Sequence, residues 1–169
     1  EPGVKASLEY WKSGPIGVIG TTATIASQIY RRKIQEQRAD IEVLEQACPL
    51  FVPLVEEGWL EGEITESVIR RYLSSFLEAK VNDVILGCTH YPLLKGALQK
   101  VLGKEVVLID SAEVVAREVE FQLKQENLLK SARDSAPFKI FVTDPPRKFE
   151  EIAQRFLGFS VPSAEKIVL

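Results

Sequence analysis

The most constraining feature of this sequence is a set of short apolar runs, each bounded by turn residues and separated by segments with helical periodicity. The runs PIGVIG and VILG, the latter within NDVILG, are continuously apolar, and IEVLEQAC and EVVLI follow the same pattern less strictly. A continuous apolar run is typical of a strand buried on both faces, as in a parallel sheet that helices cover. Strands that alternate with helices therefore predict an α/β fold with a mostly parallel sheet and flanking helices.

The segments between these runs have the apolar spacing of helices. A first helix begins near Val4 and closes at Ser13-Gly14. Further helices are predicted at about 22–37, 63–79, 92–102, 112–130 and 147–157, and another strand at 138–144. The segment between Cys48 and Gly62 is interrupted by prolines and glycines, so a loop with a short helical turn is expected there.

Composition excludes several classes of function. Lys and Arg number 21 against 24 Asp and Glu, a net charge of −3 with the two signs mixed along the chain, so we do not expect nucleic acid as a partner. The apolar runs are far shorter than the roughly 18 residues of a spanning helix, so a membrane protein is not expected either. Two unpaired cysteines favour a reducing cytoplasm. Met is absent and the chain opens Glu1-Pro2-Gly3, so its N-terminus looks cut.

The first polar cluster, Gly20-Thr21-Thr22-Ala23-Thr24, ends PIGVIG and opens the next helical segment. Ligands of parallel sheets bind beyond the carboxyl ends of the strands. Hydroxyls and free amide groups at a helix N-terminus can hold a carboxylate or a phosphate there. The alternative is an ordinary helix cap, since Thr is a favoured N-cap residue, and on the cluster alone the cap is the favoured interpretation.

The second cluster, Gly87-Cys88-Thr89-His90-Tyr91-Pro92, follows NDVIL and contains the only histidine of the sequence. A thiol beside an imidazole can be held partly as the reactive thiolate. Free cysteines are often buried structural residues instead. The polar run of Cys88, Thr89 and His90 at the carboxyl end of a strand favours a functional site over that alternative.

The third group lies in the proline-interrupted loop. Apolar neighbours surround Cys48, which we interpret as a structural residue. Glu56 could orient an imidazole or a substrate ammonium group, or it could be a solvated surface charge. The spacing of the residues does not choose between these roles.

Four stretches together resemble a known family. EPGVKA, GVIGTTATIAS, ACPLFVPLVEEGWLEGE and ILGCTHYPLLK, in this order, resemble the later two-thirds of the bacterial glutamate racemases, and the resemblance extends through VVLIDSAEVVA. It covers most of residues 1–112, whereas after about residue 130 only the strand–helix pattern is similar. It implies a cofactor-independent, metal-free cytoplasmic isomerase that supplies D-glutamate for peptidoglycan synthesis. The family's two α/β domains hold the substrate in the cleft between them, with a catalytic cysteine on each side.

The resemblance also implies catalytic roles for three residues. Cys88 matches the second catalytic cysteine, in the Gly-Cys-Thr-His motif, and acts as the base toward L-glutamate. His90 matches the histidine that assists proton transfer, and Glu56 matches an acidic residue near that histidine. A histidine at position 90, where the related aspartate racemases usually have a glutamate, favours glutamate as the substrate.

The substrate-binding residues and the domain organisation follow from the same resemblance. Thr21, Thr24 and Thr89 match residues that bind the substrate. Residues 5–111 are expected to form the second racemase domain, and residues 112–169 to return to a first domain that carries the other catalytic cysteine and has no counterpart here. The expected partners are glutamate and that missing N-terminal domain, and a homodimer is left open. This chain alone is expected to be inactive.

Three alternatives remain at this point. The chain could be a racemase-like domain that binds a small carboxylate or a partner protein without turnover. It could have an aspartate racemase type of activity. A thiol-dependent hydrolase that uses Cys88 and His90 is weaker, because residues two apart on a strand-end loop must bend toward each other and no separate third member to orient the histidine is evident.

Overall fold

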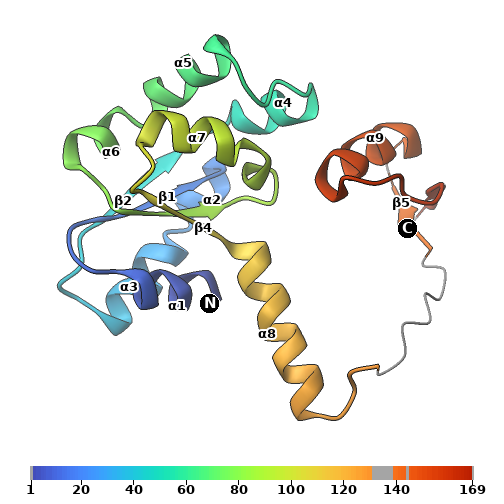
Figure 1. The fold of residues 1–169 in the computed structure, drawn as a ribbon, viewed down its shortest axis with the longest axis horizontal. Coiled ribbons are helices and arrows are strands. Elements are labelled where there is room, and N and C mark those ends of the chain that lie inside the picture. The colour runs from blue at the N-terminus through green and yellow to red at the C-terminus, as the bar shows by residue number, and fades with distance from the viewer. Residues whose placement is uncertain (1, 131–138, 144, 169) are drawn as a thin grey trace. The chain divides into compact units, whose positions relative to one another are not determined.

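The structure, a computed structural model, describes residues 2–130, 139–143 and 145–168, which form two compact units that divide between Leu128 and Leu129. The first unit contains a four-stranded sheet in the order β2-β1-β3-β4, in which every pairing is parallel (Figure 1). The strands are β1 (Ile16–Gly20), β2 (Val43–Ala47), β3 (Asp83–Gly87) and β4 (Val107–Asp110). The α/β fold predicted from the sequence is thus confirmed.

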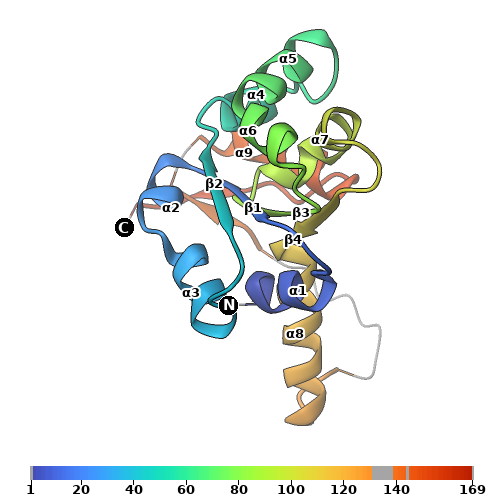
Figure 2. The same cartoon turned by 90° about the vertical axis from the view of Figure 1, so that its left-hand side faces the viewer.

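Helices cover both faces of this sheet (Figures 1 and 2). One face is covered by α1 (Pro2–Tyr10) and α3 (Ile29–Gln37), and α8 (Ser111–Gln125) packs against α1. The helices of the other face are α4 (Phe51–Glu56), α5 (Glu63–Tyr72), α6 (Ser74–Ala79) and α7 (Lys95–Leu102). The two helical layers explain why the central strands are apolar at every position except Asp83 of β3.

Strand β3 contributes side chains to the hydrophobic cores on both faces of the sheet. Val84 and Leu86 belong to the core under α4 to α7, whereas Ile85 belongs to the core under α1 and α3. Successive side chains of a strand point to opposite faces. All three residues are at most 1% exposed, so this part of the strand is a continuous apolar run because neither of its faces meets water.

The helix predicted at 22–37 is two helices. It divides into α2 (Thr22–Ala26) and α3, because Gln28 adopts a left-handed conformation with φ of 52°. The hydroxyl of Ser27 donates to the carbonyl of Thr24 at 2.6 Å and accepts from the amide of Ile29. Ser side chains compete with helical hydrogen bonds in this way, and apolar spacing does not reveal it.

Two other predicted helices are also divided. The 63–79 segment breaks at the fully buried Leu73, between α5 and α6. The 92–102 segment begins with a 3₁₀ turn, η1 (Tyr91–Leu94), before α7 starts. The predicted helical turn within the proline-interrupted loop is α4.

The second unit begins at Leu129 and contains a short parallel pair of strands and one helix. These are β5 (Phe141–Val142), β6 (Glu165–Lys166) and α9 (Pro146–Leu157). Phe138 and Asp144, the ends of the strand predicted at 138–144, lie outside the described residues, and β6 was not predicted. The expected boundary after residue 111 differs from the division at Leu128, because α8 packs against α1 and β3 of the first unit.

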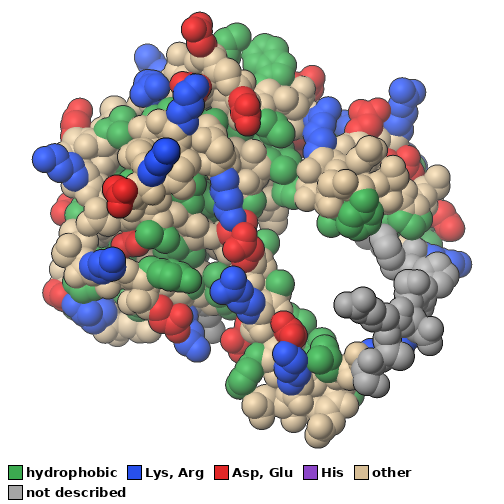
Figure 3. Space-filling view, viewed as in Figure 1, with side chains coloured by type: hydrophobic (Ala, Val, Ile, Leu, Met, Phe, Trp, Pro, Cys, Tyr) green, Lys and Arg blue, Asp and Glu red, His purple; other side chains and the backbone are tan. Residues whose placement is uncertain are grey.

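Two surface properties bear on the classes of function. Among the described helices, none has both the length and the apolar character that crossing a membrane requires. On the face of the first unit that Figure 3 shows, Lys and Arg side chains are interspersed with Asp and Glu side chains.

Candidate active site

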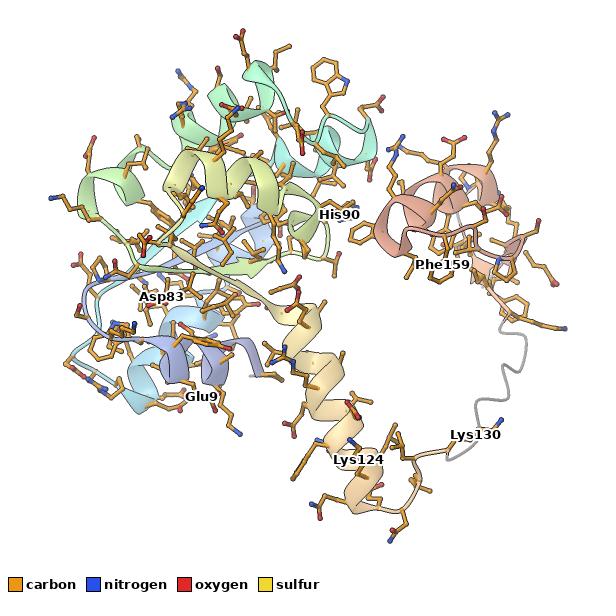
Figure 4. The ribbon with its side chains drawn as sticks, viewed as in Figure 1. Glu9, Asp83, His90, Lys124, Lys130 and Phe159 are labelled. Atoms are coloured by element: carbon orange, nitrogen blue, oxygen red, sulfur yellow. The ribbon has the colours of Figure 1, made fainter. Side chains whose placement is uncertain are left out.

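The candidate site lies at the carboxyl ends of three neighbouring strands. Gly20, the last residue of β1, is paired with Ala47 of β2 on one side and with Gly87 of β3 on the other. The residues that follow, Thr21, Cys48 and Cys88, therefore leave the sheet at the same edge. Figure 4 shows His90 beyond this end of β3, with Asp83 at the opposite end. This is the edge at which parallel sheets bind ligands.

Gly87 allows β3 to approach β1 closely just before Cys88. A Cβ atom at this position would lie 2.8 Å from the carbonyl oxygen of Ile19 and 3.2 Å from the ring of Tyr30. A backbone atom cannot move aside as the end of a flexible side chain can. Glycine at position 87 is therefore required by close packing between the strands.

Cys88 and His90 contact each other directly. The Nδ1 atom of His90 lies 3.9 Å from the Sγ atom of Cys88, and both side chains are partly exposed. The amide of Tyr91 donates to the carbonyl of Cys88 at 3.2 Å, which closes a turn around Cys88, Thr89 and His90. The bend that a contact between residues two apart requires is present, because this turn folds the imidazole back toward the thiol.

Glu56 is the third member of the cluster. Its Oε1 atom lies 3.8 Å from the Nε2 atom of His90. Nε2 of the imidazole therefore faces the carboxylate of Glu56, and Nδ1 faces the thiol of Cys88. Glu56 is the last residue of α4, which the loop after β2 carries to this edge of the sheet. Of the roles left open by the sequence, the geometry favours orientation of the imidazole. It also supplies the separate third member that sequence reasoning did not find for a Cys–His pair.

The three threonines lie beside this cluster and have local partners. Thr21 is the N-cap of α2, where its hydroxyl accepts from the amide of Thr24 at 3.2 Å and lies 2.9 Å from the Thr24 hydroxyl. The capping interpretation therefore describes the structure. The helix dipole does not support carboxylate or phosphate binding at Thr21–Thr24, because α2 has only five residues. Thr89 is exposed, and its hydroxyl lies 3.5 Å from Nδ1 of His90.

Cys48 has the environment of a structural residue. Its side chain is 0% exposed in the core beneath α4 to α7, and its thiol donates to the carbonyl of Gln46 at 3.6 Å. Burial raises the pKa of the Cys48 thiol to about 12. A thiol held protonated in this way is neither a base nor a nucleophile at neutral pH.

Sequence reasoning missed two residues that shape the site, Gly87 and Tyr91. The sequence gives no sign that Gly87 faces a carbonyl oxygen across the sheet. Tyr91 has a weak signal, an aromatic residue with a polar tip directly after the polar run. In the part of the chain that the structure describes, no group of three or more His, Cys, Asp and Glu side chains could hold a metal ion.

Known proteins resemble the chain in both sequence and fold. The family model for Asp/Glu/Hydantoin racemase matches residues 1–119. The glutamate racemase of Geobacter metallireducens is 44% identical over 158 residues, which are 94% of this chain and 58% of that protein. The chain thus spans about three-fifths of the length of the curated relatives it matches.

Two solved structures agree with this relationship. Glutamate racemase from Francisella tularensis, in complex with D-glutamate, matches with a TM-score of 0.88 and 34% identity over 99% of this chain and 61% of its own. Glutamate racemase isoform RacE1 from Bacillus anthracis matches with a TM-score of 0.90 and 33% identity over 99% of this chain and 62% of its own. The chain belongs to the Asp/Glu/Hydantoin racemase family.

Proposed function

We propose that this chain forms one side of the active site of a glutamate racemase, with Cys88 as the acid or base on one face of the α-carbon. The observation that carries this proposal is the line from Glu56 through His90 to Cys88, at 3.8 and 3.9 Å. The thiol at its end is partly exposed at the ligand-binding edge of the sheet. The relatives named above, all glutamate racemases, support the choice of glutamate.

The proposed reaction moves a proton through a carbanion. With L-glutamate, the Cys88 thiolate takes the α-proton, so the C–H bond breaks and an S–H bond forms. A second acid then delivers a proton to the opposite face, and the reverse reaction exchanges the two roles. His90 would hold or release the proton of Cys88, and Glu56, 3.8 Å from Nε2, would orient its imidazole.

The second acid is proposed to lie outside this sequence. The sequence has two cysteines, and Cys48 is buried and protonated. The resemblance assigns the other role to a cysteine of the family's first domain. Because α8 packs against α1 and β3, we propose that only the part of residues 112–169 after Leu128 returns to that domain. We also propose that the chain by itself does not racemise glutamate at an enzymatic rate. The cleft between the two domains would orient the substrate and exclude water.

The substrate contacts are proposed from position. Thr21 and Thr24 follow β1 and Thr89 follows β3, so their hydroxyls lie at the ligand-binding edge. Hydroxyl and amide donors aimed at the substrate carboxylates would stabilise the charge that develops as the proton leaves. In the cell, the product would be D-glutamate for peptidoglycan, made in the cytoplasm, and a homodimer remains compatible with this role.

A chimeric protein tests the proposal. This chain is joined behind the portion of the Geobacter metallireducens racemase that precedes the matched region, and optical activity is followed by circular dichroism from pure L- and D-glutamate. We expect the chimera to racemise both isomers, Cys88→Ala to abolish this, and Cys48→Ala to retain it. The unjoined chain should be inactive. A Cys88→Ala chimera as active as its parent would end the proposal, and rapid racemisation by the unjoined chain would place the second acid within it.

A further inference from the structure

We propose that Tyr91 is a positioning residue, which holds the Cys88–His90 turn in register with the loop after β2 and with the helix that carries Glu56. The inference rests on the proposed function, because it concerns the geometry of that site. Tyr91 touches none of the reacting groups with its hydroxyl. It acts through backbone groups of the segments that present them.

Tyr91 joins two of the strand-end segments by hydrogen bonds. Its side chain is 0% exposed, and its hydroxyl donates to the carbonyl of Cys48 at 2.9 Å across 43 positions of sequence. Its own amide donates to the carbonyl of Cys88. One residue therefore closes the turn that holds the candidate thiol and imidazole and also ties this turn to the loop after β2.

The connection continues to the third segment. The amide of Cys48 donates to the carbonyl of Gly20 at 2.9 Å, and Gly20 directly precedes Thr21. Hydrogen bonds through Tyr91 and the backbone of Cys48 thus connect the segment after β3 to the loop after β2, and this loop to the end of β1. A displacement of the Tyr91 phenol would therefore affect both the Cys88–His90 turn and the end of β1, where Thr21 follows.

The ring of Tyr91 also fixes α4. It packs edge-on against Phe51, with the ring centroids 5.2 Å apart. Phe51 is the first residue of α4 and Glu56 is the last, so the ring contact sets one end of the helix whose other end faces His90. Aromatic pairs of this geometry favour one relative orientation.

The environment of the phenol keeps it a donor. Burial raises the pKa of the Tyr91 hydroxyl far above its usual range, and the nearby Cys48, Cys88 and Tyr72 add to this shift. The hydroxyl therefore stays protonated throughout the physiological range. This fits a positioning role and does not fit an acid or base that exchanges protons with substrate.

The test removes the hydroxyl of Tyr91 and compares the effect with removal of the hydroxyl of Tyr72. Tyr91→Phe removes the hydrogen bond to Cys48 and keeps the ring. Tyr72→Phe is the control, because the Tyr72 ring packs against the same Phe51 at 5.6 Å. Glu56→Gln shows the effect of losing the carboxylate itself. The readout is the pH profile of Cys88 alkylation by iodoacetamide in the 169-residue chain, followed by peptide mass spectrometry, with circular dichroism confirming the fold.

We expect Tyr91→Phe to slow alkylation of Cys88 near pH 7 by about threefold or more and to displace the pH profile in the same direction as Glu56→Gln. Tyr72→Phe should follow the wild type. A folded Tyr91→Phe chain with the wild-type profile would overturn the inference, as would an equal effect of Tyr72→Phe. If Glu56→Gln itself has no effect, the Glu56–His90–Cys88 line of the proposed function fails instead.

A second variant covers the case in which Tyr91→Phe does not fold. Phe51→Leu removes the ring contact and leaves the phenol and its hydrogen bond in place. The inference predicts a displacement of the alkylation profile in the same direction for this variant. A folded Phe51→Leu chain with the wild-type profile would contradict it.

Discussion

The Nδ1 atom of His90 lies 3.9 Å from the Sγ atom of Cys88, although only Thr89 separates the two residues in sequence. A single turn after β3 produces this contact, closed by the amide of Tyr91. The other side of the imidazole faces Glu56, which is 34 positions earlier in the chain and arrives through the fold of α4. The candidate site therefore combines one local contact with one long-range contact.

The two thiols should differ strongly in reactivity. With a pKa of about 12, Cys48 is thiolate to about one part in ten thousand at pH 8, and it is also inaccessible. We predict that iodoacetamide at pH 8 modifies Cys88 alone in the folded chain and both cysteines in urea. Peptide mass spectrometry measures this. Equal rates for the two cysteines in the folded chain would contradict the assigned burial.

The same two positions should differ in stability. Cys48→Ala removes a fully buried side chain, and we expect the free energy of unfolding to fall by about 1–2 kcal/mol. Cys88→Ala, at a partly exposed position, should change it by about 0.5 kcal/mol or less. Urea denaturation of both variants gives the comparison. A larger loss for Cys88→Ala than for Cys48→Ala would mean that Cys88 has a structural role.

Gly87 and Gly96 form a matched pair of glycine positions. Alanine at 87 would press against the carbonyl oxygen of Ile19, whereas alanine at 96, in α7, would meet only the end of Glu61 at 3.7 Å. We predict that Gly87→Ala destabilises the chain by about 1–3 kcal/mol. Gly96→Ala should stabilise it by up to about 1 kcal/mol, because alanine favours helix. Thermal unfolding distinguishes these outcomes, and a neutral Gly87→Ala would refute the close approach of the strands.

Asp83 should give stability a pH dependence of known sign. It is 2% exposed, its Oδ2 atom has no hydrogen-bond partner among the described residues, and burial raises its pKa, with Lys12 opposing. Because the pKa of Asp83 is higher in the folded than in the unfolded chain, its contribution to folding stability is fully present below the unfolded pKa, near 4. That contribution is lost as pH rises through the folded pKa. As pH rises from 3.5 to 7, the free energy of unfolding of Asp83→Asn should therefore increase relative to that of the wild type.

Asp40 provides the opposite control. The Arg38 guanidinium lowers the pKa of this exposed carboxyl through a hydrogen bond, so its contribution is present above the unfolded pKa and is lost as pH falls. Asp40→Asn should lose stability relative to wild type over the same rise in pH. Urea unfolding at several pH values measures both variants, and slopes of the same sign would contradict one of the two environments.

The strands and the position of the candidate thiol could be predicted because both depend on short-range patterns. Continuous apolar runs such as NDVILG indicate buried parallel strands, and a polar run directly after one falls at the ligand-binding edge. The division of the 22–37 helix could not be predicted, because it depends on the hydrogen bonds of the Ser27 hydroxyl. The contact between Glu56 and His90 depends on tertiary packing, so residue spacing did not predict it and only the family resemblance placed the two residues close together. The hydrogen bond from Tyr91 to Cys48 also depends on tertiary packing, and the sequence did not predict it.

The role of Cys88 is tested most directly by exchange of the substrate α-proton in heavy water. The chimera described above is incubated with L-glutamate in D2O, and proton NMR with chiral analysis follows the α-hydrogen of each isomer. A base at Cys88 predicts that deuterium enters the α-position of the D-glutamate formed, and that Cys88→Ala removes both exchange and inversion while Cys48→Ala leaves them. Deuterated D-glutamate formed at the parental rate by the Cys88→Ala chimera would contradict the assignment of Cys88 as the base.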